Sequence, residues 1–382
     1  MKGLLVSFCN VSPFDFILGA YEFENDNFQW IKMDPLVTNC IGATGIAIAK
    51  GHYWVVWQGR GSSIIKLDAN FKATAVYPLP ISRDVHSILP YDGGFLVADT
   101  FRNCVNLARV SENDSTIVES EFWRQCNSVD KDEIHLNSVC NLNGETYISC
   151  FGDKPADGWQ SSRMGKIINI NTGEVVCDRL EHPHTLFSWR GGIYWLESKT
   201  GLLHKYTPGG KHEVLMQLDG YVRGLVFDDD FIYIGASALR RFSRSTGTLN
   251  NIASDKPDDF HCWIYRVSQR TGKIERRNLT SYGAEIYDLF LVPNMPLEMS
   301  GSSNGYASAE RLWRIEDDFR AREQKLQQSL HAYEEELRQC KLKLEELGRE
   351  HELVQAELES LRRSTWVRIR TTVGILVHKL LR

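Results

Sequence analysis

The chain has 382 residues, of which 42% are hydrophobic and 24% are charged, and its net charge is -5. This length exceeds that of the usual single domain, so we expect one large domain and a smaller region. The acidic balance argues against nucleic acid as a partner of the whole chain, because a phosphate backbone needs a basic surface.

The N-terminal segment MKGLLVSFCN contains an apolar run that is too short for a signal peptide, and it has no small-residue cleavage site. No stretch approaches the roughly 18 apolar residues that span a bilayer. The nine cysteines are odd in number and include no C-x-x-C pair. We therefore expect a cytoplasmic protein whose thiols are reduced.

Residues 1–298 contain a repeated pattern of short strands. Each unit has a short strand, a Gly or Asp turn, a longer strand and then a further strand, which in two units precedes a Thr-Gly turn. Five such units align, and their aligned segments begin at Ile46, Ser87, Ser138, Thr185 and Leu225. Four strands in a unit of roughly 40 to 60 residues is the plan of a β-propeller blade.

The two ends of this region supply a sixth blade. The segment AEIYDLFLVPN, residues 284–294, offers an inner strand, and residues 1–34 offer the outer strands. A blade completed from both ends closes the ring and removes a sheet edge. We predict an all-β, six-bladed β-propeller; a seventh blade within residues 100–135 or 236–262 is the alternative.

The repeat also places the histidines. In a propeller, the innermost strand of each blade lines the central channel, so residues at the starts of these strands gather at one mouth. Counting back from the aligned turns gives equivalent positions for Thr44, His86, Asn137, His184 and Arg223, with His135 and His182 two residues earlier on the same side of their strands. In the sixth blade Glu285 is placed similarly, and Tyr287 follows two residues later. We expect these nine residues to form a ligand-binding ring.

Three interpretations of this ring stay open. In the first, His86, His184, His135 and Glu285 bind a divalent metal that serves a lyase or hydrolase, with Asn137 as an alternative to His135. In the second, the ring binds a small polar or anionic molecule such as a sugar phosphate, and Arg223 makes bidentate contacts. In the third, the histidines satisfy one another and the propeller is a protein-interaction scaffold.

The composition changes near residue 300. Residues 299–308 form a small-polar linker, and residues 309–363 carry a heptad pattern. The residues of the first seam position are Leu312, Phe319, Leu326, Tyr333, Cys340, Leu347, Val354 and Leu361, and Leu330, Leu337, Leu344 and Leu358 fill the second. Such a pattern predicts a long α-helical coiled coil that forms a homo-oligomer. A single amphipathic helix folded onto the propeller is the alternative.

The last segment, residues 364–382, predicts a basic amphipathic helix. Its apolar and basic residues are typical of a helix that lies on an anionic membrane surface without crossing it. The residues expected to contact the membrane are Trp366, Arg368, Ile369, Arg370, Val373, Leu376, Lys379 and Leu380. The alternative is that the heptad continues into this segment as coiled-coil core.

Five segments, DVHSI, IHLNSV, HPHTL, YVRGLVF and EIYDL, occur in this order within residues 1–295. In this they resemble a bacterial family of propellers, the domain of unknown function DUF4915. The resemblance implies a six-bladed propeller with a distant likeness to NHL, gluconolactonase and strictosidine-synthase-like propellers, and it implies no activity. The C-terminal tail resembles those of some bacterial glycosyltransferases and polysaccharide-assembly proteins, which implies a cell-envelope setting.

Together these patterns favour a propeller that binds a small polar or anionic ligand at the mouth of its channel. A coiled coil would join it into an oligomer, and the tail would attach it to the inner face of the membrane. A metal-dependent lyase or hydrolase and a non-catalytic scaffold are the alternatives.

Overall fold

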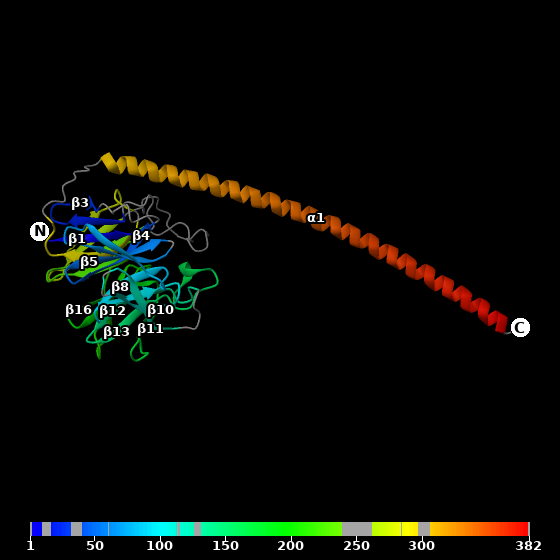
Figure 1. Ribbon diagram of the computed structural model, residues 1–382, viewed down its shortest axis with the longest axis horizontal. Helices are drawn as coiled ribbons and strands as arrows, with labels where there is room; N and C mark the ends of the chain where they lie inside the picture. The colour runs from blue at the N-terminus through cyan, green and yellow to red at the C-terminus, as the bar shows by residue number, and fades with distance from the viewer. Residues whose placement is uncertain are drawn as a thin grey trace. The chain divides into compact units, whose positions relative to one another are not determined.

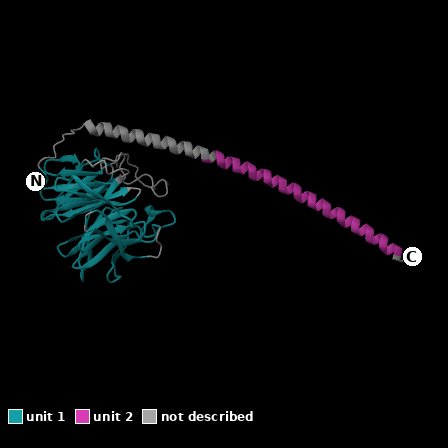
Figure 2. Cartoon of the chain, viewed as in Figure 1, with its two compact units in different colours: residues 1–309 teal, residues 310–382 magenta. Residues whose placement is uncertain are grey.

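The computed structural model describes residues 2–9, 17–31, 40–59, 61–111, 113, 115–125, 131–238, 262–283, 285–296 and 306–380. The chain divides into two compact units, Met1–Ala309 and Glu310–Arg382, which Figure 2 shows in different colours.

The described strands of the first unit form six four-stranded antiparallel sheets, which are the blades of a β-propeller (Figure 1). For each blade, the strands are given in their order from the channel outward. Blade 1 comprises β24 (Ile286–Val292), β1 (Gly3–Phe8), β2 (Leu18–Glu22) and β3 (Asn27–Trp30), and blade 2 comprises β4 (Cys40–Ala49), β5 (His52–Gly59), β6 (Ser63–Leu67) and β7 (Ala73–Pro78). Blade 3 comprises β8 (Val85–Tyr91), β9 (Gly94–Asp99), β10 (Cys104–Val110) and β11 (Ile117–Arg124).

The other three blades have the same strand order. Blade 4 comprises β12 (Leu136–Leu142), β13 (Glu145–Cys150), β14 (Gly165–Asn169) and β15 (Val175–Leu180), with a short 3₁₀ helix, η1 (Trp159–Ser161), between β13 and β14. Blade 5 comprises β16 (Pro183–Trp189), β17 (Gly192–Glu197), β18 (Leu202–Tyr206) and β19 (His212–Gln217), and blade 6 comprises β20 (Tyr221–Phe227), β21 (Phe231–Ser237), β22 (Trp263–Ser268) and β23 (Ile274–Asn278). The prediction of six blades is confirmed.

Blade 1 is assembled from both ends of the propeller sequence, as predicted. β24 pairs antiparallel with β1, in a register that runs from Gly3 opposite Val292 to Phe8 opposite Ile286. Because the chain's first strands complete the sheet begun by its last strand, the ring is closed by backbone hydrogen bonds. The pairing covers the edge of β1, which another chain could otherwise pair with.

The burial of the strands changes with their place in the blade. Every residue of the second strands β9 and β17 is buried, whereas the outermost strands β19 and β23 are largely exposed. The buried apolar side chains pack between neighbouring sheets, and one cluster joins residues of blades 1, 2 and 6. Cysteines contribute to this interior: Cys9, Cys104, Cys140, Cys150 and Cys262 are buried.

Each inner strand has an irregularity near its start. In β4, β8, β12 and β24 the pairing skips one residue, which is Thr44, His86, Asn137 and Tyr287 respectively. In β16 and β20 the shift follows directly after His184 and Arg223. A β-bulge redirects a side chain from the ordinary alternation. The fold therefore changes direction at the positions where the sequence predicts the ring.

The second unit holds all but the first turn of the helix α1 (Tyr306–Leu380), which is 75 residues long. It begins within the predicted linker, and residues 299–305 lie outside the described part of the chain. The helix continues without a break through residues 363 and 364, so the predicted coiled-coil and tail segments share one helix. Among the described residues, no helix has a stretch apolar enough to cross a bilayer.

Candidate functional site

Six residues, one from each blade, occupy equivalent places at one mouth of the channel. We call them the inner ring: Thr44, His86, Asn137, His184, Arg223 and Tyr287. The equivalence is supported by the next residue along each strand, because Ser87, Ser138, Thr185 and Asp288 each accept a hydrogen bond from a backbone N–H of a neighbouring blade. In blade 1 the inner-ring position belongs to Tyr287.

A second set of residues lies two positions earlier in each blade. We call it the outer ring: Gly42, Asp84, His135, His182, Tyr221 and Glu285. Glu285 therefore aligns with His135 and His182, not with His86. Asp84, His135 and His182 have φ angles of 52°, 48° and 60°. Left-handed backbone is uncommon in non-glycine residues and is concentrated at functional sites.

Side chains of the two rings form a closed circuit of contacts. Ring centroids are 5.2 Å apart between His135 and His86 and 5.6 Å apart between His86 and Tyr287. The Arg223 guanidinium lies 5.3 Å from the Tyr287 ring centre and 4.5 Å from that of Tyr221. Phe151 completes the circuit, since Tyr221 contacts His184, His184 contacts Phe151, and Phe151 contacts His135. The structure thus brings the predicted histidines, the arginine and the tyrosine together.

Two of the four histidines use both ring nitrogens within the protein. His182 Nε2 lies 2.8 Å from the carbonyl oxygen of Trp159, to which it donates, and its Nδ1 accepts from the Tyr221 hydroxyl at 3.0 Å. His86 Nε2 lies 3.3 Å from the Asp84 carboxylate, and its Nδ1 lies 3.3 Å from the amide nitrogen of Asn137. Burial lowers the pKa of His182 to about 3, so this side chain is neutral. These contacts hold the rings in place.

His184 presents one free acceptor. The Ser198 hydroxyl donates to the carbonyl oxygen of Val222, so His184 Nδ1 donates its hydrogen to Ser198 Oγ at 2.7 Å or to the His182 carbonyl oxygen at 3.0 Å. Burial, reinforced by the charge of Arg223, holds the pKa of His184 well below its ordinary value. The neutral ring therefore keeps a lone pair on Nε2, for which no partner exists among the described residues.

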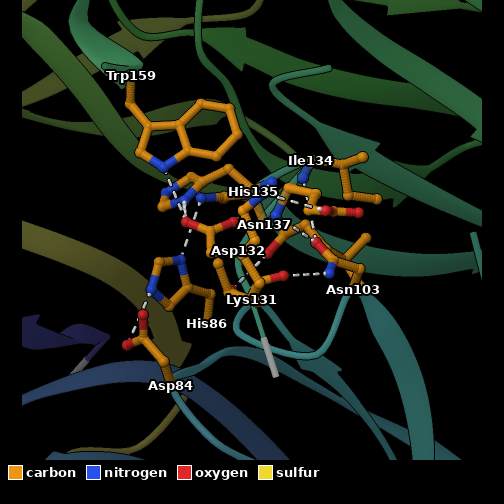
Figure 3. Close-up of polar contacts among 12 residues, drawn as sticks. Asp84, His86, Asn103, Lys131, Asp132, Ile134, His135, Asn137 and Trp159 are labelled. Carbon is orange, nitrogen blue, oxygen red and sulfur yellow. Dashed lines mark hydrogen bonds and ion pairs between the residues drawn. The ribbon is translucent and has the colours of Figure 1, made fainter. Parts of the chain in front are cut away.

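His135 is oriented by a carboxylate, as Figure 3 shows. Its Nδ1 lies 2.8 Å from Asp132 Oδ2, and the same oxygen accepts from the Trp159 indole at 2.8 Å. Burial opposes ionisation of Asp132, but His135, His86 and the indole outweigh it and lower the pKa of this carboxyl group. The Asp132 carboxylate thus fixes the orientation of the His135 ring.

Arg223 supplies a buried positive charge. Its Nη1 lies 3.3 Å from Glu285 Oε2 and 3.6 Å from the Cys9 sulfur. Burial disfavours the charge, but Tyr221, Cys9, Glu285 and Tyr287 together raise the pKa of the guanidinium above its ordinary value. Its Nε–H is buried and has no hydrogen-bond partner among the described residues. One donor of a charged group is therefore unused.

Tyr287 supplies a second unused donor. Its hydroxyl is buried and has no hydrogen-bond partner within the described structure. Burial raises the pKa of this phenol well above its ordinary value, so the O–H group is retained. By contrast, the hydroxyl of Thr44 donates to the carbonyl oxygen of Val85 at 2.6 Å and is already satisfied.

The residues suggested as metal ligands do not fit that role. Three metal ligands must point at one centre. Across the described ranges, no group of three His, Cys, Asp or Glu side chains could hold a metal ion. Glu285 pairs with Arg223, and His86 Nε2 and His135 Nδ1 face the carboxylates of Asp84 and Asp132. We therefore derive no chemistry through a metal.

Several residues of the mouth were not predicted. Asp84 and Tyr221 lie two residues before inner-ring positions, so the same counting that selects His135 and His182 would have found them. Asp132 and Trp159 lie on connections outside the inner strands, and the repeat carries no signal for them. Phe151 follows directly after β13, where only the fold shows that it faces the histidines.

The fold and the mouth define the class of this protein, which is a six-bladed β-propeller with a polar ring at one end of its channel. The chain belongs to the family described as domain of unknown function DUF4915, whose profile matches residues 66–299. The resemblance of its five segments to that family is confirmed. A search of curated proteins found no match.

Solved structures support the fold alone. A structure from Bacteroides caccae, of a protein of unknown function, has a TM-score of 0.51 at 12% identity over 77% of this chain and 99% of that chain. A chain of the nidogen/laminin complex has a TM-score of 0.50 at 11% identity over 78% of this chain and 100% of that chain. A proposed 6-phosphogluconolactonase from Bacteroides fragilis has a TM-score of 0.47 at 10% identity, covering 76% and 98%.

Proposed function

We propose that the propeller binds a small polar or anionic ligand at the mouth of its channel. The observation that carries this proposal is the pair of buried donors without partners, Arg223 Nε–H and the Tyr287 hydroxyl. An unsatisfied buried donor costs about 1 to 3 kcal/mol. A ligand that supplies an acceptor to both groups would recover that free energy.

The other groups of the mouth fit the same ligand. The Nε2 lone pair of the neutral His184 is an acceptor for a hydroxyl group. Arg223 favours a carboxylate or phosphate, although the nearby Glu285 carboxylate reduces its net charge. A molecule with an anionic group and one or more hydroxyl groups would match the donors and acceptors together.

The test uses Tyr287→Phe, which removes one oxygen and keeps the ring. Inorganic phosphate and gluconate are the anionic probes, and glucose is the neutral probe. We expect an anionic probe to raise the melting temperature of the wild-type protein and to bind in calorimetry. Its affinity for Tyr287→Phe should be about tenfold to a hundredfold lower, because a hydrogen bond to an anion is lost.

Tyr91→Phe is the matched control, because Tyr91 ends the strand β8 whose second residue is His86. It should bind the probes as the wild type does. Equal affinity of Tyr287→Phe and the wild type would show that the probe does not bind at the inner ring. If neither the anionic probes nor glucose bind to the folded wild-type protein, the scaffold interpretation is favoured.

We also propose that α1 joins copies of the chain through its heptad seam. Seam residues are exposed on this helix: Leu337 by 60%, Leu344 by 75%, Leu347 by 63%, Val354 by 60% and Leu361 by 60%. In a parallel, in-register pair, the flanking positions would place Glu336 near Lys341 and Glu357 near Arg362 of the second copy. Both pairs are attractive, and such pairs set orientation in coiled coils.

The tail carries a separate apolar face, and we propose that it rests on an anionic membrane surface. Continuing the heptad past Leu361 puts Thr365, Arg368, Thr372, Ile375 and Lys379 at the seam, so the seam becomes mostly polar. The exposed apolar residues lie on another face: Trp366, Ile369, Val373 and Leu376. This shift supports lipid contact over extension of the coiled coil. The likeness of the tail to polysaccharide-assembly proteins is the basis for a cell-envelope setting.

A further inference from the structure

Below the inner ring, the channel has a layer of polar side chains whose polar atoms are already used. Ser87, Ser138, Thr185 and Asp288 lie one residue inward from inner-ring positions. Each accepts a backbone hydrogen bond from a neighbouring blade, at 3.5 Å for Ser87, 3.0 Å for Ser138, 3.1 Å for Thr185 and 3.0 Å for Asp288. These groups tie the blades together and offer little to water in the channel.

The next layer is apolar all the way round. Each blade contributes one side chain, and these form a belt: Ile46, Ile88, Val139, Leu186, Leu225 and Leu289. All six are buried, with exposed fractions between 1% and 7%. A complete apolar belt in the channel of a propeller is a wall that water does not bind well.

The belt surrounds an open space. A cavity of about 290 Å³ is lined by the belt and also by His86, Asn137 and Tyr287 of the inner ring. Asp288 also lines this cavity, and burial raises the pKa of its carboxyl group to about 7. Tyr287 belongs both to the ring and to this cavity, so the polar mouth and the apolar channel form one continuous site.

We propose that the ligand is amphiphilic, with an anionic head at the inner ring and a slender apolar chain inside the channel belt. This rests on the proposed function and specifies the class of its ligand. A pocket that binds small molecules is usually lined mostly by apolar groups with a few polar groups that fix orientation. The ring supplies those polar groups, and the belt supplies the apolar wall.

The experiment compares acetate, hexanoate and decanoate as probes for the full-length protein by calorimetry. Each CH₂ group transferred from water to an apolar site contributes up to about 0.8 kcal/mol, or about fourfold in affinity. We expect decanoate to bind at least about tenfold more tightly than hexanoate, and hexanoate more tightly than acetate. Decanol, which has the chain without the anionic head, should bind more weakly than decanoate.

Two variants narrow the channel and leave the ring unchanged: Val139→Phe and Ile88→Phe. Either variant that retains the wild-type circular dichroism spectrum should lose the gain in affinity with chain length. Val118→Phe is the matched control, because Val118 is 64% exposed on the outer strand β11. It should keep that gain, which separates the channel from apolar surfaces elsewhere on the chain.

The outcomes separate the two proposals. Suppose that inorganic phosphate or acetate binds the wild type and binds Tyr287→Phe more weakly, but that affinity for the wild type does not depend on chain length. The ring then binds anions, and an amphiphilic ligand is excluded. If affinity rises with chain length equally in wild type, Val139→Phe and Ile88→Phe, the chain binds outside the channel and the inference is overturned. If neither an anionic probe nor glucose binds, the proposed function itself fails.

Discussion

The propeller and the C-terminal helix differ in the exposure of their leucine side chains. Leu5 in β1 is fully buried, whereas Leu344 in α1 is 75% exposed. The propeller closes its own ring and covers its apolar side chains with neighbouring blades. The helix has a regular apolar stripe, whose described seam residues from Leu337 onward are exposed. We propose that this stripe is covered by a second copy of the chain, whereas the propeller covers its apolar side chains within one chain.

This difference also separates the kinds of function that each region can have. In the mouth of the propeller, histidines, Arg223 and Tyr287 are fixed by hydrogen bonds and packing before any ligand arrives, which is the condition for selective binding. The apolar seam of α1 is exposed at its described residues. The role proposed for the helix therefore depends on association with a second copy or with a membrane. Joining several propellers would raise the effective strength of weak tail contacts with a membrane.

The largest expected effect comes from making the same substitution in both regions. Leu5→Ala should lower the free energy of unfolding of the propeller by about 2 to 5 kcal/mol, because it leaves a cavity in a closed core. Leu344→Ala should leave propeller unfolding unchanged and shift the oligomer toward smaller species. Urea unfolding followed by circular dichroism measures the first effect, and light scattering after size exclusion measures the second.

Both variants should be compared with the wild type at one protein concentration, since association alters apparent stability. The contrast between the regions breaks if Leu344→Ala destabilises the propeller as much as Leu5→Ala does. It also breaks if Leu344→Ala has no effect on the size of the oligomer, because the stripe would then not be a seam.

A smaller effect on stability is expected from a buried carboxyl group in the propeller. Asp99 at the end of β9 is fully buried, and burial raises the pKa of its carboxyl group to about 7. The folded state therefore holds a proton that the unfolded state releases from about pH 4 upward, and the stability from this group is lost as pH rises to about 7. Asp99→Asn removes this dependence, so its stability relative to wild type should rise by about 1 to 3 kcal/mol between pH 4.5 and pH 8.

Asp153→Asn is the control for this series, because Asp153 is exposed. Its stability relative to the wild type should stay constant over the same pH range. Parallel pH profiles for Asp99→Asn and wild type would show that the buried carboxylate is compensated by neighbours such as Asn106 and the backbone of Arg102.

The propeller could be predicted because its repeat uses the same chemistry in every blade. A short strand, a turn and a buried strand recur six times, and closure requires only that the ends pair. The inner ring could be predicted for the same reason, since a shared position in the repeat becomes a shared place in space. In blade 1 the inner-ring position belongs to Tyr287 and not to Glu285, because Tyr287 is the residue skipped in the pairing of β1 with β24, as His86 is in the pairing of β8 with β9.

The supporting residues of the mouth could not be found in this way. Asp132 and Trp159 come from loops whose paths depend on the assembled blades. The left-handed backbone of Asp84, His135 and His182 also could not be predicted from the sequence, because Asp and His occur in many other conformations. Sequence periodicity locates equivalent positions in the blades, whereas the partners that orient the histidines depend on tertiary packing.

The smallest effect tests whether the last turns of the helix differ from its seam. Trp366 is 73% exposed and lies on the face that the seam does not include. Trp366→Ala should lower the fraction of full-length protein that sediments with phosphatidylglycerol-containing vesicles by on the order of threefold to tenfold, since an interfacial Trp anchors such helices. Thr371→Ala, on another face of the same helix, should bind as the wild type does. If Trp366→Ala changes the oligomer size and leaves vesicle binding intact, the tail belongs to the coiled coil. The whole helix would then serve oligomerisation alone.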